Sequence, residues 1–316
     1  MVFSQHGPLP DTASSIRLSV VICPDCRSNV LTSSPLKEIA VIDIPGGQPR
    51  RLTKDLVDDE SPSWHPNGKC LIFSSGRPAS GAFAANGLKR AFMYELDKGT
   101  IEPIWKRVSP HIPKEVEFVQ MLSPIWSPCR NAFAFGMVGL GSCRLGVYNI
   151  ENDSLAIFCI IPTPIRLRWS PSGRYVAFEG VYIPPFDDTE ALWHVSTAVG
   201  FVDLQHDSAT IIDTTSRAFL ADWSPDGDRI LLGNPDTTLR QTSIYEFDVR
   251  KKRQVWRDSL QADELVGYGQ TSSEVLFLRD TPRGRDVWCY DMRTHQYQQI
   301  TFNCPYMEGA SIFRRR

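Results

Sequence analysis

The sequence predicts an all-β protein made of one repeated unit, and two observations support this prediction. The first is a phrase consisting of an aromatic residue, a tight turn and an apolar strand. Its clearest copy runs from Trp223 through Pro225, Asp226 and Gly227 into Ile230. Proline presets φ at the first corner of a turn and glycine accepts positive φ, so this turn is expected to join two antiparallel strands.

The second observation is the regular return of this phrase along the chain. Copies that keep the tryptophan are centred on Trp64, Trp126, Trp169 and Trp223, and weaker copies surround Tyr268 and Ile312. The copies are separated by roughly 43 to 62 residues, a period typical of β-propeller blades. Six copies predict six blades. Each tryptophan is expected to be buried at the same place on an inner strand, between neighbouring blades.

The repeated unit resembles the TolB-like propeller repeat, a family that is also described as WD-like. A blade of that family reads as Trp-Ser-Pro-Asp-Gly, an apolar strand, a Tyr-containing strand ending in Asp, and a strand ending in Leu-Thr. The third element is present at Tyr245 to Asp248 and the fourth at Arg50 to Thr53. The resemblance covers nearly the whole chain and implies a six-bladed β-propeller with four antiparallel strands per blade. It implies no single function, because the repeat serves binding proteins and enzyme accessory domains alike.

The two ends of the chain are expected to share one blade. Residues 16–53 supply three strands that no hairpin phrase precedes, and residues 308–313 supply the missing innermost strand. Such closure removes the open sheet edges that would template aggregation. Residues 1–316 are therefore predicted to form a single propeller domain.

Composition argues against nucleic acid and membranes as partners. The chain has 316 residues, 42% of them hydrophobic, and a net charge of −2, so it can bury a large core without attracting polyanions. It has no stretch of 18 apolar residues that would insert into a membrane. The N-terminus lacks a basic region followed by an apolar run, and cysteines lie in predicted strands. We expect a cytoplasmic monomer, or a periplasmic or secreted protein if the N-terminus shown is a processed one.

The segment from Cys23 to Cys26 is the one motif typical of metal or redox chemistry. A zinc site needs a second ligand pair at a defined spacing, and a redox pair needs a helix start, and the sequence provides neither. We interpret the segment as a loop with two thiols; half of a metal site and a redox pair are the alternatives. No metal and no cofactor are predicted.

Catalytic motifs are also missing from the sequence. It contains no Gly-x-Ser-x-Gly nucleophile elbow, no His-Glu-x-x-His and no phosphate-binding loop. The predicted inner strands contain no histidine, unlike the metal-dependent lyases among TolB-like propellers. We therefore expect a non-enzymatic scaffold for protein–protein interaction. The alternative is a carbohydrate-binding or carbohydrate-active propeller, a lyase or hydrolase, with an axial pocket.

The long connections predict which face binds the partner. If the strands of a blade are A to D from the axis outward, B-to-C loops and D-to-A crossovers share one face. The long segments all belong there: Cys23 to Leu36, Gly76 to Lys89, Tyr182 to Glu190, Asn234 to Arg240, and the connector Arg107 to Gln120. Function concentrates in loops that a rigid scaffold displays. We therefore expect partner contacts at Arg77, Phe83, Tyr182, Phe186, Asp187 and Asp188.

Overall fold

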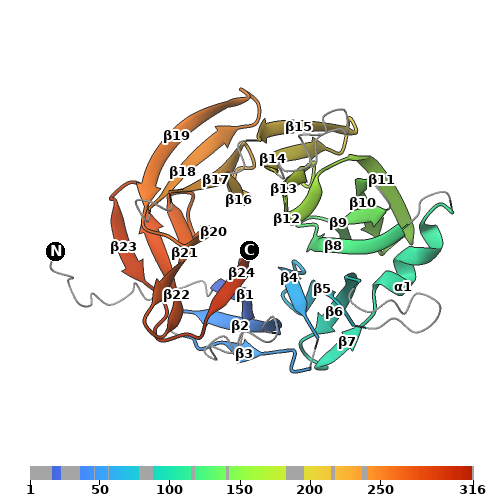
Figure 1. Ribbon diagram of the computed structural model, residues 1–316, viewed down its shortest axis with the longest axis horizontal. Coiled ribbons are helices and arrows are strands. Elements are labelled where there is room, and N and C mark those ends of the chain that lie inside the picture. The colour runs from blue at the N-terminus through green and yellow to red at the C-terminus, as the bar shows by residue number, and fades with distance from the viewer. Residues whose placement is uncertain are drawn as a thin grey trace.

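The computed structural model describes residues 16–22, 36–45, 47–55, 57–77, 88–114, 118–139, 142–182, 196–214, 218–236 and 241–314. These residues form six antiparallel sheets of four strands each. The sheets stand as blades around a central axis, with one strand of each blade innermost (Figure 1). The six-bladed β-propeller predicted from the sequence is confirmed.

The first three blades follow the chain in order, each beginning with its innermost strand. Blade 1 contains β4 (Asp59–Trp64), β5 (Cys70–Ser75), β6 (Arg90–Glu95) and β7 (Thr100–Glu102). Blade 2 contains β8 (Phe118–Trp126), β9 (Ala132–Gly139), β10 (Cys143–Asn149) and β11 (Ser154–Ile160). Blade 3 contains β12 (Thr163–Trp169), β13 (Tyr175–Tyr182), β14 (Ser196–Asp203) and β15 (Ser208–Asp213).

The last three blades include the one that joins the two ends of the chain. Blade 4 contains β16 (Phe219–Trp223), β17 (Arg229–Asp236), β18 (Gln241–Asp248) and β19 (Arg253–Leu260). Blade 5 contains β20 (Glu264–Tyr268), β21 (Glu274–Thr281), β22 (Gly284–Asp291) and β23 (Gln296–Gln299). Blade 6 contains β24 (Met307–Arg314), β1 (Ile16–Ile22), β2 (Glu38–Ile44) and β3 (Arg50–Arg51). The pairing of β1 with β24 confirms the predicted closure of the ring.

The hydrophobic core lies between the blades. Strands in the middle of a blade are covered on both faces, and they are accordingly runs of consecutive apolar residues. Leu71, Ile72 and Phe73 in β5 are fully buried, as are the residues from Ile230 to Leu232 in β17. The outermost strands are covered on one side only, and β11, β15 and β19 consist mainly of exposed and partly buried residues.

The four repeat tryptophans end the inner strands β4, β8, β12 and β16, and all four are buried. Two of them also link neighbouring blades by hydrogen bonds. Trp169 Nε1 donates to the carbonyl oxygen of Ile125 in blade 2 at 3.2 Å. Trp223 Nε1 donates to the carbonyl oxygen of Arg168 in blade 3 at 3.0 Å. Each indole therefore joins apolar packing to one directed contact across a blade boundary.

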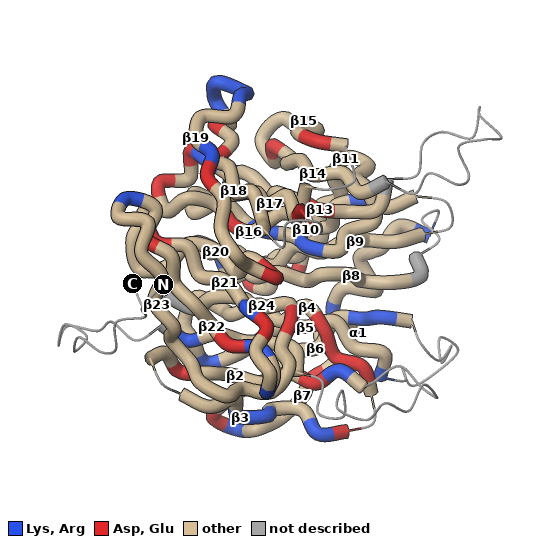
Figure 2. The backbone as a smooth tube through the Cα atoms, turned by 60° about the vertical axis from the view of Figure 1, so that its left-hand side comes forward, with Lys and Arg blue, Asp and Glu red and all other residues tan. Residues whose placement is uncertain are grey.

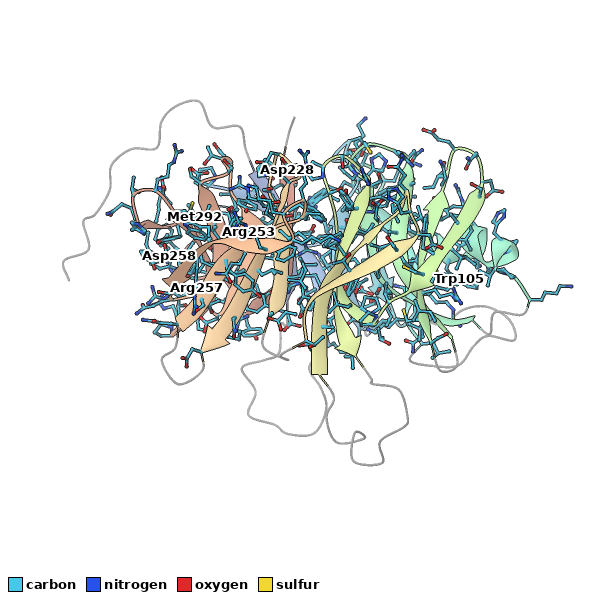
Figure 3. The ribbon with its side chains drawn as sticks, turned by 90° about the horizontal axis from the view of Figure 1, so that it is seen from above. Trp105, Asp228, Arg253, Arg257, Asp258 and Met292 are labelled. Carbon is cyan, nitrogen blue, oxygen red and sulfur yellow. The ribbon has the colours of Figure 1, made fainter. Side chains whose placement is uncertain are left out.

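The disc has two different faces, which we name by their connections. The turn face carries the tight turns that follow the inner strands, such as residues 65–69 and 224–228. The crossover face is the opposite one, where the inner strands begin, at Asp59, Thr163 and Glu264 for example. Figure 3 shows the disc edge-on, with Asp228 of the turn face at its upper edge.

Two expected connections differ from the structure. The connector from Arg107 to Gln120 joins the outermost strand β7 to the innermost strand β8 as expected, but α1 (Trp105–Val108), the 3-10 helix Ser109–His111 and the start of β8 occupy most of it. The buried side chains of Trp105 and Val108 hold α1 against the core. The expected loop from Asn234 to Arg240 is shorter, because β17 pairs with β18 as far as Asp236 opposite Gln241.

Charged residues are distributed over the whole ring. Acidic and basic positions are interspersed along the backbone, and no blade carries one sign alone (Figure 2). This distribution agrees with the net charge of −2. Among the described residues, no helix is long and apolar enough to cross a membrane.

Candidate functional site

A ring of β-bulges shapes the inner wall of the propeller. The register of every inner strand shifts relative to its neighbour, twice in β8 and once in the other five, for example between Glu60 and Ser63, between Leu122 and Ile125, and between Leu220 and Asp222. Ser61 and Ser123 adopt positive φ angles of 55° and 49° at two of these bulges. A bulge interrupts the ladder of hydrogen bonds. Backbone carbonyls near the axis therefore become available to side chains.

An axial cavity of about 490 Å³ lies inside this ring, at the crossover face. The beginnings of five inner strands contribute to its wall, through Glu60, Leu122, Thr163, Glu264 and Glu308 among others. Its volume is within the range of ordinary ligand sites, about 300 to 1,000 Å³. The cavity is the place where segments far apart in the sequence present both charged and apolar groups to one space.

The rim of the cavity combines ion pairs with one exposed apolar residue. Lys37 Nζ lies 2.8 Å from Glu308 Oε1, and Lys89 Nζ lies 3.6 Å from Glu60 Oε1. Ile165 is 48% exposed although it belongs to an inner strand. An exposed isoleucine beside a concave, partly charged surface is a suitable anchor for a partner.

Arg166 is a compensated charge in the cavity wall. Its Nη2 lies 3.1 Å from Glu264 Oε1, and its Nη1 donates to the carbonyl oxygen of Leu220 at 2.8 Å. Glu264 in turn accepts the backbone N–H of Gly309 at 2.9 Å and lies 3.5 Å from Arg285 Nη1. This network links blades 3, 4, 5 and 6 across the axis.

Arg168 enters the same cavity two residues further along β12, but its contacts are of a different kind. All three of its hydrogen bonds go to backbone carbonyl oxygens, those of Ala221 (3.0 Å), Leu167 (3.0 Å) and Ala310 (3.3 Å). Burial, and then the charge of Arg166, lower the pKa of Arg168 to about 10. The guanidinium is therefore still charged at neutral pH. The side chain lies inside the ring of blades, but it is only half-buried because it lines the cavity.

The residues around the cavity are suited to binding. The wall supplies carboxylates, guanidinium groups, backbone groups and apolar side chains, and neither a histidine nor a cysteine is among its lining residues. Within the described parts of the chain, no three His, Cys, Asp or Glu side chains come together as a metal site would require. Such a wall can recognise charge and shape.

The structure places Arg77, one of the expected partner contacts, in an ion-pair cluster of blade 1. Its guanidinium pairs with Asp59, which is fully buried, and its Nη2 lies 2.7 Å from Asp55 Oδ2. The same group lies 5.5 Å from the centre of the Phe73 ring and 5.7 Å from that of Phe92. These contacts attach the end of β5 to β4. They pair the charge of Arg77 within the protein, so its position needs no contact with a partner protein.

The other expected contacts cannot be placed with the cavity. Tyr182 is the last residue of β13, where only its backbone is described. Phe83, Phe186, Asp187 and Asp188 lie outside the described residues, as do Cys23 and Cys26. The strand ends that flank these segments, Ser75, Arg90 and Ser196, lie at the crossover face with the cavity.

The cavity residues were not among the site residues expected from the sequence; they include Arg166, Arg168, Glu264 and Ile165. A signal for them exists in the sequence, because Arg166 and Arg168 alternate along a predicted inner strand and should face the same side. Their partners do not follow from local patterns. Ala310 is 142 positions from Arg168 in the chain, and Glu264 is 98 positions from Arg166.

Comparison with known proteins identifies the fold. The sequence matches no protein-family model and no curated protein sequence. Among solved structures, TolB from Acinetobacter baumannii superposes with a TM-score of 0.64 at 14% identity, over 94% of this chain and 66% of that one. The chain thus spans slightly less than two thirds of that TolB structure. At these identities the comparison shows the fold alone, which is a TolB-like six-bladed β-propeller.

Two further structures show how widely this fold is used. A chain in the nidogen/laminin complex superposes with a TM-score of 0.59 at 8% identity, covering 96% of this chain and 99% of that one. Acylaminoacyl peptidase from Pyrococcus horikoshii has a TM-score of 0.51 at 12% identity, covering 78% of this chain and 39% of the enzyme. One neighbour comes from a protein complex and the other is an enzyme, so the function has to be inferred from the site.

Proposed function

We propose that this chain is a non-enzymatic propeller scaffold that binds a protein partner on its crossover face. The observation that carries the proposal is the axial cavity, because it unites charged groups from several blades with the exposed Ile165 on that face. Interfaces depend on a few apolar or charged anchors in a concave centre with a polar rim. The cavity wall and its rim have this composition.

The scaffold that carries the site is built to be rigid. Blade 6 closes the ring through β1, whose seven residues all pair with β2 on one side and of which six pair with β24 on the other. The Arg166–Glu264 contact and the indole hydrogen bonds join further blades. A rigid frame lowers the entropy that a binding surface loses on association. The connections at Phe83, Phe186, Asp187 and Asp188 belong to the same proposed surface, although they lie outside the described residues.

Two exposed isoleucines allow a matched test of this proposal. Ile165 borders the axial cavity, whereas Ile160 ends the outer strand β11 and is 59% exposed. The experiment is affinity capture from a lysate of the native cell with immobilised wild-type protein, Ile165→Asp and Ile160→Asp, followed by mass spectrometry. Both positions are exposed, so both variants should fold with nearly unchanged melting temperatures.

The expected result is a set of proteins that wild type and Ile160→Asp both retain and that Ile165→Asp loses. A charge in place of an apolar anchor removes its packing and leaves an unpaired group in the interface. Retention of the same proteins by all three forms would refute binding at the cavity. Loss with Ile160→Asp alone would move the interface to the outer edge of blade 2.

We also propose that the protein acts as a monomer in the cytoplasm. The six cysteines among the described residues are all free thiols, which is typical of proteins from reducing compartments. Light scattering after gel filtration tests the first part of this proposal, and fractionation of the native cell tests the second. A stable dimer, or recovery with secreted or envelope fractions, would contradict it.

A further inference from the structure

We propose that the axial cavity binds a carboxylate group, which Arg168 receives through N–H groups that the fold leaves without an acceptor. This proposal adds a ligand group to the proposed function. It rests on that function only in assigning the carboxylate to a partner protein.

The hydrogen bonds of Arg168 leave part of its guanidinium free. A guanidinium carries five N–H donors, one on Nε and two on each Nη. Nε donates to Ala221, one Nη1 hydrogen to Leu167 and one Nη2 hydrogen to Ala310, all at carbonyl oxygens. Among the described residues, the second hydrogens of Nη1 and Nη2 have no further acceptor. Two N–H groups on neighbouring nitrogens are the fork that binds a carboxylate in a bidentate manner.

Among the described residues, no carboxylate forms a direct ion pair with Arg168, and the charges of Asp222, Glu179 and Glu264 act on it from further away. The other cations in the cavity wall form such a pair, since Lys37 pairs with Glu308 and Arg166 with Glu264. None of the ion pairs formed by the described residues includes Arg168; its contacts are to neutral carbonyl groups. Removing a charge from bulk water without a directly paired counter-charge costs free energy, part of which an incoming anion would recover.

Three carboxylates near Arg168 could oppose a bound anion, namely Asp222, Glu179 and Glu264. Asp222 accepts the backbone N–H of Trp223 at 2.9 Å, and Glu179 accepts that of Leu220 at 2.9 Å. Glu264 also has a charge that is already compensated. It accepts from Arg166 and from the backbone N–H of Gly309, and Arg285 lies on its other oxygen. The carbonyl oxygens beside Arg168 are likewise occupied by its own donors. The position in front of Arg168 is therefore favourable for negative charge.

The cavity gives such a ligand both access and room. Its wall includes Arg168, and its volume of about 490 Å³ accommodates an acidic side chain with the adjoining backbone. The exposed Ile165 lies in the same wall and offers apolar surface to the rest of a peptide. These features favour an Asp or Glu side chain of a partner segment; a free small carboxylate shares the same chemistry and is separated from it by the test.

The test measures binding of small probes to the full-length protein by ligand-observed NMR. The probes are the capped peptide acetyl-Gly-Asp-Gly-amide, its neutral counterpart with Asn in place of Asp, and glutarate. We expect wild type to bind the Asp peptide and to bind the Asn peptide at least tenfold more weakly. Stronger binding of the Asp peptide than of glutarate identifies a protein segment as the source, and the reverse order identifies a free carboxylate.

Variants then assign the site to Arg168. Arg168→Gln should weaken binding of the Asp peptide at least tenfold, whereas Arg174→Gln, at an arginine of the turn face that pairs with Asp203, should not change it. If Arg168→Gln does not fold, Arg168→Lys keeps the charge but loses the planar fork, and it should also bind more weakly. Equal binding of the Asp and Asn peptides, no binding of either carboxylate, or an affinity that Arg168→Gln or Arg168→Lys leaves unchanged would overturn the inference. These probes contain no partner protein, so their failure is distinguishable from failure of the capture experiment.

Discussion

Replacing two of the repeat tryptophans by phenylalanine should have unequal effects on stability, because their indole N–H groups differ. Trp223 Nε1 donates to the Arg168 carbonyl at 3.0 Å. Trp126 Nε1 is buried, and no acceptor for it is present among the described residues. Both side chains are almost completely buried, with 2% and 5% of their surface exposed, so the loss of packing on Trp→Phe should be similar.

The difference between the two variants isolates the hydrogen bond. Trp223→Phe loses a contact worth about 0.5 to 1.5 kcal/mol, whereas Trp126→Phe removes an unsatisfied N–H that costs about 1 to 3 kcal/mol. These two effects add, so Trp223→Phe should be less stable than Trp126→Phe by about 1.5 to 4.5 kcal/mol. At about 2.1 cal/mol/K of unfolding entropy per residue, this corresponds to about 2 to 7 °C in melting temperature for a chain of 316 residues.

Calorimetry and urea unfolding of the two variants and the wild type provide the measurement. The urea midpoints are compared at a common slope, because variants of one fold expose the same surface on unfolding. Equal destabilisation, or a lower melting temperature for Trp126→Phe, would refute the assignment of the blade 3–4 hydrogen bond as a stabilising contact.

The remaining predictions concern the closure of the ring, acid stability and thiol reactivity. Deleting residues 307–316 removes β24 and exposes the edge of β1, so the truncated protein should aggregate or oligomerise in light scattering; a soluble, cooperatively melting monomer would contradict the closure. Asp203 accepts from Arg174, from His206 and from a backbone N–H, and these contacts hold its pKa well below the usual range. Asp203→Asn should therefore melt below wild type at pH 7. A carboxyl group whose pKa is lower in the folded than in the unfolded protein adds its full stability only above the unfolded pKa, so the difference in melting temperature should shrink as the pH falls below about 4. A constant difference down to pH 2 would contradict this prediction. Among the described cysteines, Cys129 is exposed, whereas burial raises the pKa of Cys143 to about 12. Alkylation mapped by mass spectrometry should therefore modify Cys129 first. Earlier labelling of Cys143 would count against the packing of blade 2.

The repeat itself was predictable because its determinants are local. The Pro-Asp-Gly corner after Trp223 sets a turn by backbone preference alone, and Gly227 has the positive φ of 77° that this turn requires. The apolar run after each turn marks a strand that is buried on both sides. Closure by the C-terminal strand also followed, because the three N-terminal strands of blade 6 lacked an innermost strand in the sequence.

Features that depend on distant contacts could not be predicted in this way. The short helix α1 has only four residues, too few for a periodic pattern, and its burial depends on Trp105 packing against the core. The cavity depends on where bulges from separate blades place their carbonyls. Arg168 gives no sign in the sequence that its acceptors are Ala221 and Ala310 in two other blades.

Hydrogen–deuterium exchange of the protein with and without its captured partner tests most directly whether the crossover face is the binding face. We expect slower exchange in peptides that contain the starts of the inner strands, around Glu60, Leu122, Thr163 and Glu308. Exchange in the hairpin turns of the opposite face, residues 127–131, 170–174 and 224–228, should stay unchanged. Protection confined to those turns, with no change around the axial cavity, would contradict the account.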